Sequence, residues 1–163
     1  MQEEYCRHKE KCFTGSAPSV ARVSRTFGES VAETWLSAQI FDLAKKLKVL
    51  EGTDAQDFDW LARVILGGED EKYGDFKLTE FMFFFQNFKR GKYERFYGHF
   101  DPHVVTRSLR QFKAEREEIL GKYADAKAAE ERKREKQRWE QEKATPEQIQ
   151  QIIEKFTKKE TEE

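Results

Sequence analysis

The sequence contains few of the features that membrane proteins and disulfide-rich secreted proteins need. Only two of its 163 residues are cysteine, which is too few for a framework of disulfides. No apolar run approaches the roughly 18 residues of a membrane span. The N-terminal stretch MQEEYCRHKEKC also lacks the apolar segment of a signal peptide. We therefore expect a soluble, cytoplasmic protein that makes no contact with membranes.

Sequence motifs of common enzymes are missing as well. The chain has no GxxxxGK[ST] phosphate loop, no glycine-rich dinucleotide fingerprint and no HExxH string. His99, Asp101 and His103 alternate as in an acid–base or metal triad, but a helix N-cap before Pro102 fully explains Asp101. No nucleophile or substrate pocket is recognisable beside them. The sequence therefore predicts a non-enzymatic protein with no cofactor and no small-molecule substrate.

Three potential zinc ligands lie close together near the N-terminus, namely Cys6, His8 and Cys12. A structural zinc site needs four ligands, so His99 or His103 would have to supply the fourth. The simpler interpretation is two reduced thiols in a flexible N-terminal arm over residues 1–17. We therefore expect no metal site.

Charge is abundant but almost balanced, with 30 lysines and arginines against 31 aspartates and glutamates. Its distribution is uneven, because residues 28–75 hold 11 acidic and five basic residues whereas residues 77–116 hold four acidic and nine basic ones. This pattern predicts one acidic and one basic face, although solvated helices can separate charge without any partner. The near-zero total excludes a wholesale nucleic-acid coat protein.

The 14 phenylalanines exclude a disordered chain, and the spacing of the apolar residues indicates helices. Leu78, Phe81, Phe85 and Phe88 recur at intervals of three and four. Residues 81–86 could instead form a buried strand, but the helical period continues through Phe88 and favours a helix.

Local start signals predict three further helices. Ser30 with Glu33, and Thr53 with Gln56, have capping-box spacing, and the second of these helices should end at the paired glycines 67–68. Another helix should begin at Pro102. On that helix we expect two exposed arginines, 107 and 110. A third, 116, falls on the apolar stripe, so it should either extend its charged end to solvent or pair with a carboxylate at the buried edge.

The sequence after residue 123 is very polar. Residues 124–144 contain no large apolar side chain except Trp139, and no heptad pattern supports a coiled coil. Thr145 and Pro146 then restart a helix. Its apolar stripe is a candidate partner-binding face and consists of Ile149, Ile152, Ile153 and Phe156.

Together these patterns predict an all-α protein with four or five helices in a compact bundle over residues 18–123. A long charged helical extension follows over 124–144, and a short amphipathic helix with a frayed tail over 145–163. The expected core residues are Trp35, Leu36, Ile40, Leu43, Phe58, Leu61, Ile65, Phe81, Phe85, Phe88, Leu109 and Phe112.

The segment between the helices at 78–88 and 102 is unusually rich in basic and aromatic residues. Five basic side chains, His99 included, and four aromatic ones occur in residues 89–101. Cations neutralise phosphates and aromatic rings stack on exposed bases, as in single-strand binding proteins. The alternative is that the rings fill the core and the cations face water. The candidate nucleic-acid-binding residues of this 89–110 surface are Lys89, Arg90, Lys92, Tyr93, Arg95, Tyr97, Arg107 and Arg110.

The same segment carries a family resemblance. The motif Phe88-Lys89-x-Gly91-x-Tyr93-x-x-Phe96-Tyr97-Gly98, followed by Asp101-Pro102, lies in a stretch from Trp35 to Arg116. This stretch resembles an uncharacterised family of short helical proteins of Bacteroidetes phages and mobile elements. Many members have a second glycine after the tyrosine, where this chain has Glu94. A looser likeness, in helix pattern only, is to the helical domains of phage helicase loaders.

The resemblance implies an accessory protein of a mobile genetic element. We expect it to bind nucleic acid, preferentially single-stranded, or a replisome protein in DNA replication or transfer. The alternative is a protein-binding adaptor without affinity for nucleic acid, which docks a partner through its C-terminal amphipathic helix.

Overall fold

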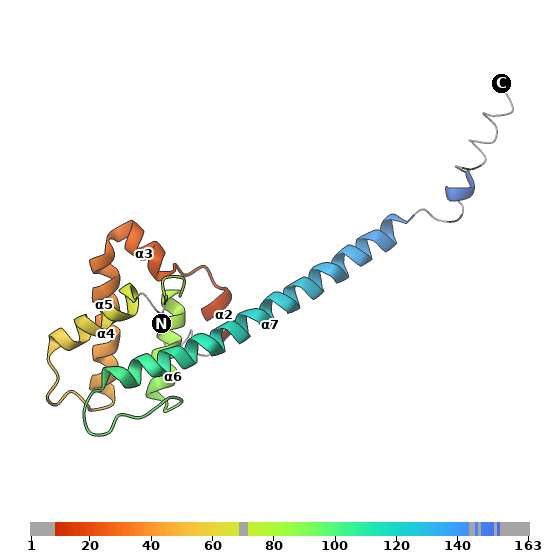
Figure 1. Cartoon of the computed structure of the whole chain (residues 1–163). Coiled ribbons are helices and arrows are strands. Elements are labelled where there is room, and N and C mark those ends of the chain that lie inside the picture. Colours follow the sequence, from red (N-terminus) through yellow and green to blue (C-terminus); the bar gives the residue numbers. More distant parts are fainter. Residues whose placement is uncertain (1–8, 69–71, 144–145, 147, 152, 154–163) are drawn as a thin grey trace. The chain divides into compact units, whose positions relative to one another are not determined.

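The predicted all-α fold is confirmed by the computed structural model. The structure describes residues 9–68, 72–143, 146, 148–151 and 153, and it contains no strand in these residues. The helices are α2 (Lys9–Thr14), α3 (Val20–Phe27), α4 (Glu29–Lys46), α5 (Ala55–Gly67), α6 (Leu78–Lys89) and α7 (Pro102–Glu142) (Figure 1). The chain divides into two units, Met1–Glu117 and Glu118–Glu163. No helix among the described residues is both long enough and apolar enough to cross a membrane.

The first unit is built on α4 and α6. Helix α4 contacts α3, α5 and α6, and α2 also lies against α6. As the phenylalanine spacing predicts, α6 is a helix that is buried on most sides. The first turns of α7 complete the core, because Val105, Leu109 and Phe112 are fully buried.

All but one of the expected core residues are buried, and the exception is Trp35, which is half-buried and packs its ring edge-on against Phe81. The structure adds several core residues that the helical stripes did not single out. Among them are Phe13, Tyr73, Phe76, Phe84, Tyr93 and Phe100.

Two predicted helix starts are displaced by one or two residues. Helix α4 begins at Glu29, directly after α3, so Gly28 rather than Ser30 occupies the cap position. Helix α5 begins after Asp54, whose backbone N–H donates to the Asp57 carboxylate at 2.9 Å. The predicted end at the paired glycines is confirmed, because α5 ends at Gly67.

The N-terminal segment is the main correction to the sequence-based description. Residues 9–14 form α2 rather than part of a flexible arm, and Cys12 and Phe13 are buried. The Phe13 ring lies against those of Phe83 and Phe112. Lys77 Nζ donates to the backbone carbonyls of Phe13 and Gly15 at 2.6 and 2.7 Å. These contacts join residues more than 60 positions apart in the chain, so no local pattern reveals them.

A partly buried ion-pair network holds α7 against the start of α6. The Arg116 Nε donates to Glu80 at 3.0 Å, and its Nη1 donates to Asp75 at 2.9 Å. The Arg116 guanidinium also lies over the Phe76 ring. Glu80 is fully buried and accepts a further hydrogen bond from the Lys77 backbone N–H at 2.7 Å. Of the two alternatives expected for Arg116, the structure shows the pairing with a carboxylate at the buried edge.

The second unit, residues 118–163, has no buried residue among those that the structure describes. Its helical part carries ion pairs four residues apart, including Lys122 with Glu118 and Arg134 with Glu130. Each such pair stabilises an exposed helix by about 0.3–0.5 kcal/mol. This unit begins six residues before the predicted boundary at residue 124, because Phe112 is the last α7 side chain that is buried.

Candidate binding surface

Two of the four aromatic side chains in residues 89–101, Tyr93 and Phe100, belong to the core, and Phe96 is half-buried against it. Tyr93 is 6% exposed and its ring lies 5.2 Å from that of Phe84. Phe96 stacks on Phe88 at 5.4 Å, and Phe100 packs against Phe58 at 5.1 Å. Tyr93 therefore has no free face on which a base could stack, which corrects its place among the candidate residues.

The Tyr93 hydroxyl lies 3.5 Å from the Glu115 carboxylate, inside the same cluster. Burial raises the pKa of Tyr93 well above its ordinary value, and the negative charge of Glu115 raises it further. The hydroxyl therefore stays protonated at any physiological pH. Its role is to close the loop over the core.

Three of the six candidate cations are paired with acids of the same chain. Lys89 bonds to Asp42, and Lys92 bonds to Glu115. Arg107 forms a two-pronged bond with Glu94, with both N–O distances at 2.9 Å. The hydrogen bonds from Arg107 lower the pKa of Glu94, and those to Glu94 raise the pKa of Arg107. The charge that these cations offer to a phosphate backbone is therefore largely neutralised.

The remaining candidates are exposed. Arg90 and Arg95 form no ion pair with any residue that the structure describes, and Tyr97 is 84% exposed. Arg110 is exposed too, and it already takes part in an interaction. The 89–110 surface thus reduces to a small group of two arginines and one tyrosine that are available to a ligand.

Asp101 has the structural role that its position before Pro102 predicts. Its carboxylate accepts a hydrogen bond from the His103 backbone N–H at 2.8 Å, at the start of α7. We expect Asp101→Ala to lower the free energy of unfolding by about 0.5–2 kcal/mol through the loss of this cap. Denaturant unfolding measures the effect. A variant with wild-type stability and abolished binding would contradict a purely structural role.

The structure also brings the end of α4 to this loop, which the sequence analysis did not anticipate. A pocket of about 220 Å³ is lined by Leu47, Val49, Phe88, Lys89, Gly91, Glu94, Arg95 and Phe96. Two exposed lysines, 46 and 48, flank the lining residue Leu47 in the chain, and a third, Lys45, lies two positions before it. These lysines lie in residues 28–75, where acidic residues outnumber basic ones, so the net charge of that region does not indicate a basic group there.

Lys48 has an unusual backbone conformation at this pocket. Its φ of 59° lies in the left-handed region, which costs a residue with a Cβ about 1–2 kcal/mol relative to glycine. The adjacent Val49 N–H donates to the Ala44 carbonyl at 3.0 Å and ends the helix. We expect Lys48→Gly to raise the free energy of unfolding by about 1 kcal/mol, measured by denaturant unfolding. A loss of stability would show that the lysine side chain contributes packing that outweighs this strain.

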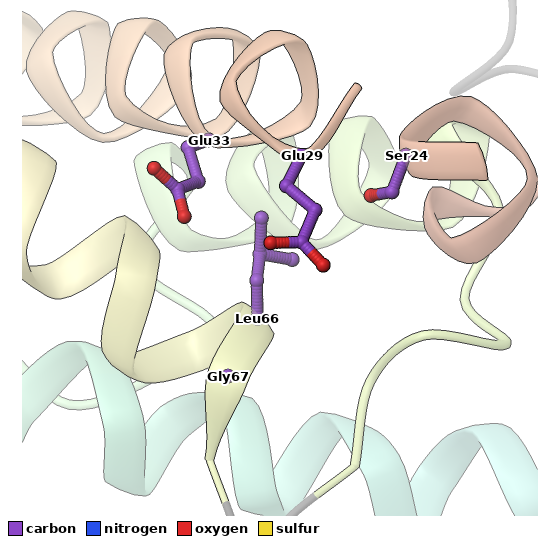
Figure 2. A pocket seen from close by; sticks show the side chains of 5 residues that line it. All are labelled: Ser24, Glu29, Glu33, Leu66 and Gly67. Atoms are coloured by element: carbon purple, nitrogen blue, oxygen red, sulfur yellow. The ribbon is translucent and has the colours of Figure 1, made fainter. Parts of the chain in front are cut away.

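A second, acidic pocket of about 130 Å³ lies where α3, α4 and α5 meet. Figure 2 shows the Glu29 and Glu33 carboxylates on α4 beside Leu66 of α5, with Ser24 of α3 nearby. Two carboxylates without a third ligand do not hold a metal ion tightly. Among the described residues, no group of three or more histidine, cysteine or acidic side chains has metal-binding geometry. Cys6 and His8 lie outside the described residues.

The candidate C-terminal face is described only in part. Ile149 and Ile153 are 48% and 59% exposed, whereas Ile152 and Phe156 lie outside the described residues. Trp139, earlier in the same unit, is 63% exposed and lies under the Lys143 ammonium. Large apolar side chains are thus exposed at several positions of the second unit.

Comparison with known proteins identifies the family but no activity. No curated protein and no solved structure matches the sequence. A family model described as a family of unknown function, DUF6633, matches residues 60–159. That match covers most of the chain, including α6, the loop at 90–101 and α7. The protein therefore belongs to this family of unknown function, DUF6633.

Proposed function

We propose that this protein is a non-enzymatic accessory protein of a mobile genetic element, which binds a protein component of the DNA replication or transfer machinery. The setting follows from the resemblance to proteins of Bacteroidetes phages and mobile elements. The preference for a protein partner over nucleic acid is supported by the ion pairs that occupy Lys89, Lys92 and Arg107. The proposal thus combines the protein-binding adaptor, which was the alternative in the sequence analysis, with the mobile genetic element that the resemblance implies.

The observation that carries the proposal is the exposure of large apolar side chains in the second unit. Trp139 and Ile149 are about half to two thirds exposed, in a unit with no buried residue among those described. Side chains of this kind are enriched at the centres of protein–protein interfaces. Ile149 and Ile153 are both exposed and lie four residues apart, which is the spacing that an amphipathic helix uses when it docks in a partner groove.

Affinity capture from the cells that encode the protein, followed by mass spectrometry, tests the proposal. The tagged full-length chain should retain a specific protein that Trp139→Ala/Ile149→Asp loses. With the purified partner, this variant should cost about 2 kcal/mol or more of binding free energy, as hot-spot residues do. Gln137→Ala/Gln150→Asp is a matched control in the same unit and should bind normally. Equal capture by both variants would contradict docking through this unit.

Binding of single-stranded nucleic acid is the second candidate. It is supported by three exposed side chains, Arg90, Arg95 and Tyr97. Neither arginine forms an ion pair with a residue that the structure describes. An exposed tyrosine stacks on a free base, which a duplex does not offer.

Fluorescence anisotropy with labelled oligothymidylate and a duplex of equal length tests this candidate. If both arginines contact phosphates, Arg90→Ala/Arg95→Ala should weaken binding and reduce the salt slope by about 1.4. Tyr97→Ala should weaken binding to the single strand alone. Arg132→Ala/Lys133→Ala removes two cations from the second unit and serves as the matched control. No binding to either DNA at low salt would exclude the nucleic-acid candidate.

A further inference from the structure

The pocket between the end of α4 and the 89–101 loop is lined by both apolar and charged side chains. Its wall contains two aliphatic and two aromatic side chains, Leu47, Val49, Phe88 and Phe96. Its volume of about 220 Å³ is sufficient for one large apolar side chain, because an apolar cavity of about 150 Å³ already holds benzene. An apolar pocket with a few charged groups at its edge is the usual form of a ligand site.

The rim of this pocket is positively charged. Arg95 lines the pocket, Arg90 lies beside it in the chain, and Lys48 stands between two lining residues. These three side chains are exposed and form no ion pair with any described residue. Two acids near the pocket are already matched, since Glu94 is bound by Arg107 and Asp42 by Lys89. An incoming carboxylate therefore meets unmatched positive charge.

The apolar wall favours a peptide over a nucleotide. A base needs an open aromatic face or polar partners for its edge, but Phe96 stacks on Phe88 and also contacts Phe100. Two of the other lining residues, Leu47 and Val49, are aliphatic, and two of the three charged ones, Lys89 and Glu94, are already held in ion pairs within the chain. A phenylalanine or leucine side chain loses no hydrogen bond on entering such a pocket, whereas a base leaves its polar edge unsatisfied.

We propose that this pocket binds an acidic linear peptide of a partner protein, with one large apolar side chain in the pocket and neighbouring carboxylates on Lys48, Arg90 and Arg95. This site is separate from the apolar side chains of the second unit, and it stands whether or not those dock a partner. The protein would then have two independent binding sites, as an adaptor requires.

The test uses the full-length protein and a short fluorescein-labelled peptide in which a run of aspartates is followed by phenylalanine. We expect saturable binding that weakens as salt increases. Replacing the phenylalanine of the peptide by alanine, or its aspartates by asparagines, should each reduce the affinity about tenfold, since both the pocket and the rim contribute. Equal binding of these three peptides would overturn the proposal, as would no binding of the first.

Variants of the protein then locate the site. Arg95→Glu should weaken binding of the aspartate–phenylalanine peptide about tenfold by reversing a rim charge, while Arg132→Ala/Lys133→Ala should leave it unchanged. Lys48→Gly relieves the backbone strain and removes a rim cation. This variant should therefore bind the peptide more weakly although it is at least as stable as the wild-type protein. Unchanged binding by Arg95→Glu and Lys48→Gly would overturn the proposal. A competition experiment adds oligothymidylate of the same net charge as the peptide. If it displaces the aspartate–phenylalanine peptide with an affinity equal to or higher than that of the peptide, the proposal is overturned in favour of nucleic acid.

Discussion

Replacing Arg116 by methionine should lower the free energy of unfolding by about 3–5 kcal/mol, because it leaves the buried Glu80 carboxylate without its cation. Glu80 is fully buried at the start of α6, and Arg116 is the cation bonded to it. Methionine keeps much of the arginine stem, so the change removes mainly the charge, its hydrogen bonds and the guanidinium contact with the Phe76 ring. Denaturant unfolding of the full-length chain measures the effect.

Two further variants separate the charge from the packing. Glu80→Gln/Arg116→Met should be more stable than Arg116→Met alone, because the buried group is then neutral. Lys122→Ala breaks an exposed ion pair with Glu118 and should cost less than 0.5 kcal/mol or so. A loss below about 1 kcal/mol in Arg116→Met would contradict the expectation that the buried Glu80 depends on this cation.

Phe112→Ala should lower the free energy of unfolding by about 3–5 kcal/mol, in the range of other buried phenylalanines. Phe112 is fully buried on α7, and its ring contacts those of four other phenylalanines. These are Phe13 of α2, Phe76 before α6, and Phe83 and Phe84 on α6. Removing the ring opens a cavity where α2, α6 and α7 meet.

The same variant should affect α2 more than the rest of the fold. Helix α2 has only six residues, too few to be stable alone in water, so it depends on contacts such as that between Phe13 and Phe112. Hydrogen exchange should therefore show earlier loss of protection at residues 9–14 than at α4. Phe27→Ala is a suitable control, because Phe27 is 69% exposed. Equal loss of protection in α2 and α4 would indicate that α2 does not unfold separately.

For the 89–110 surface, the sequence predicted the segment correctly but not which of its side chains are exposed. Basic and aromatic residues at 89–101 correctly mark the segment between α6 and α7 as unusual, but composition does not reveal which rings are buried. Tyr93 and Tyr97 are similar in the sequence, yet one is 6% and the other 84% exposed. The difference arises because Phe84 and Phe88 present a surface to Tyr93.

The sequence by itself determined the elements whose signals are local. Helix α6 follows from the spacing of its phenylalanines, and the start of α7 from Asp101 and Pro102, because helix periodicity and capping involve residues within four positions of one another. Only the tertiary structure decided which charges are available and what covers the core. Asp42 neutralises Lys89, and Phe13 reaches Phe112, across dozens of intervening residues. Such pairings depend on how the helices pack, and therefore the pocket at the end of α4 was not visible in the sequence.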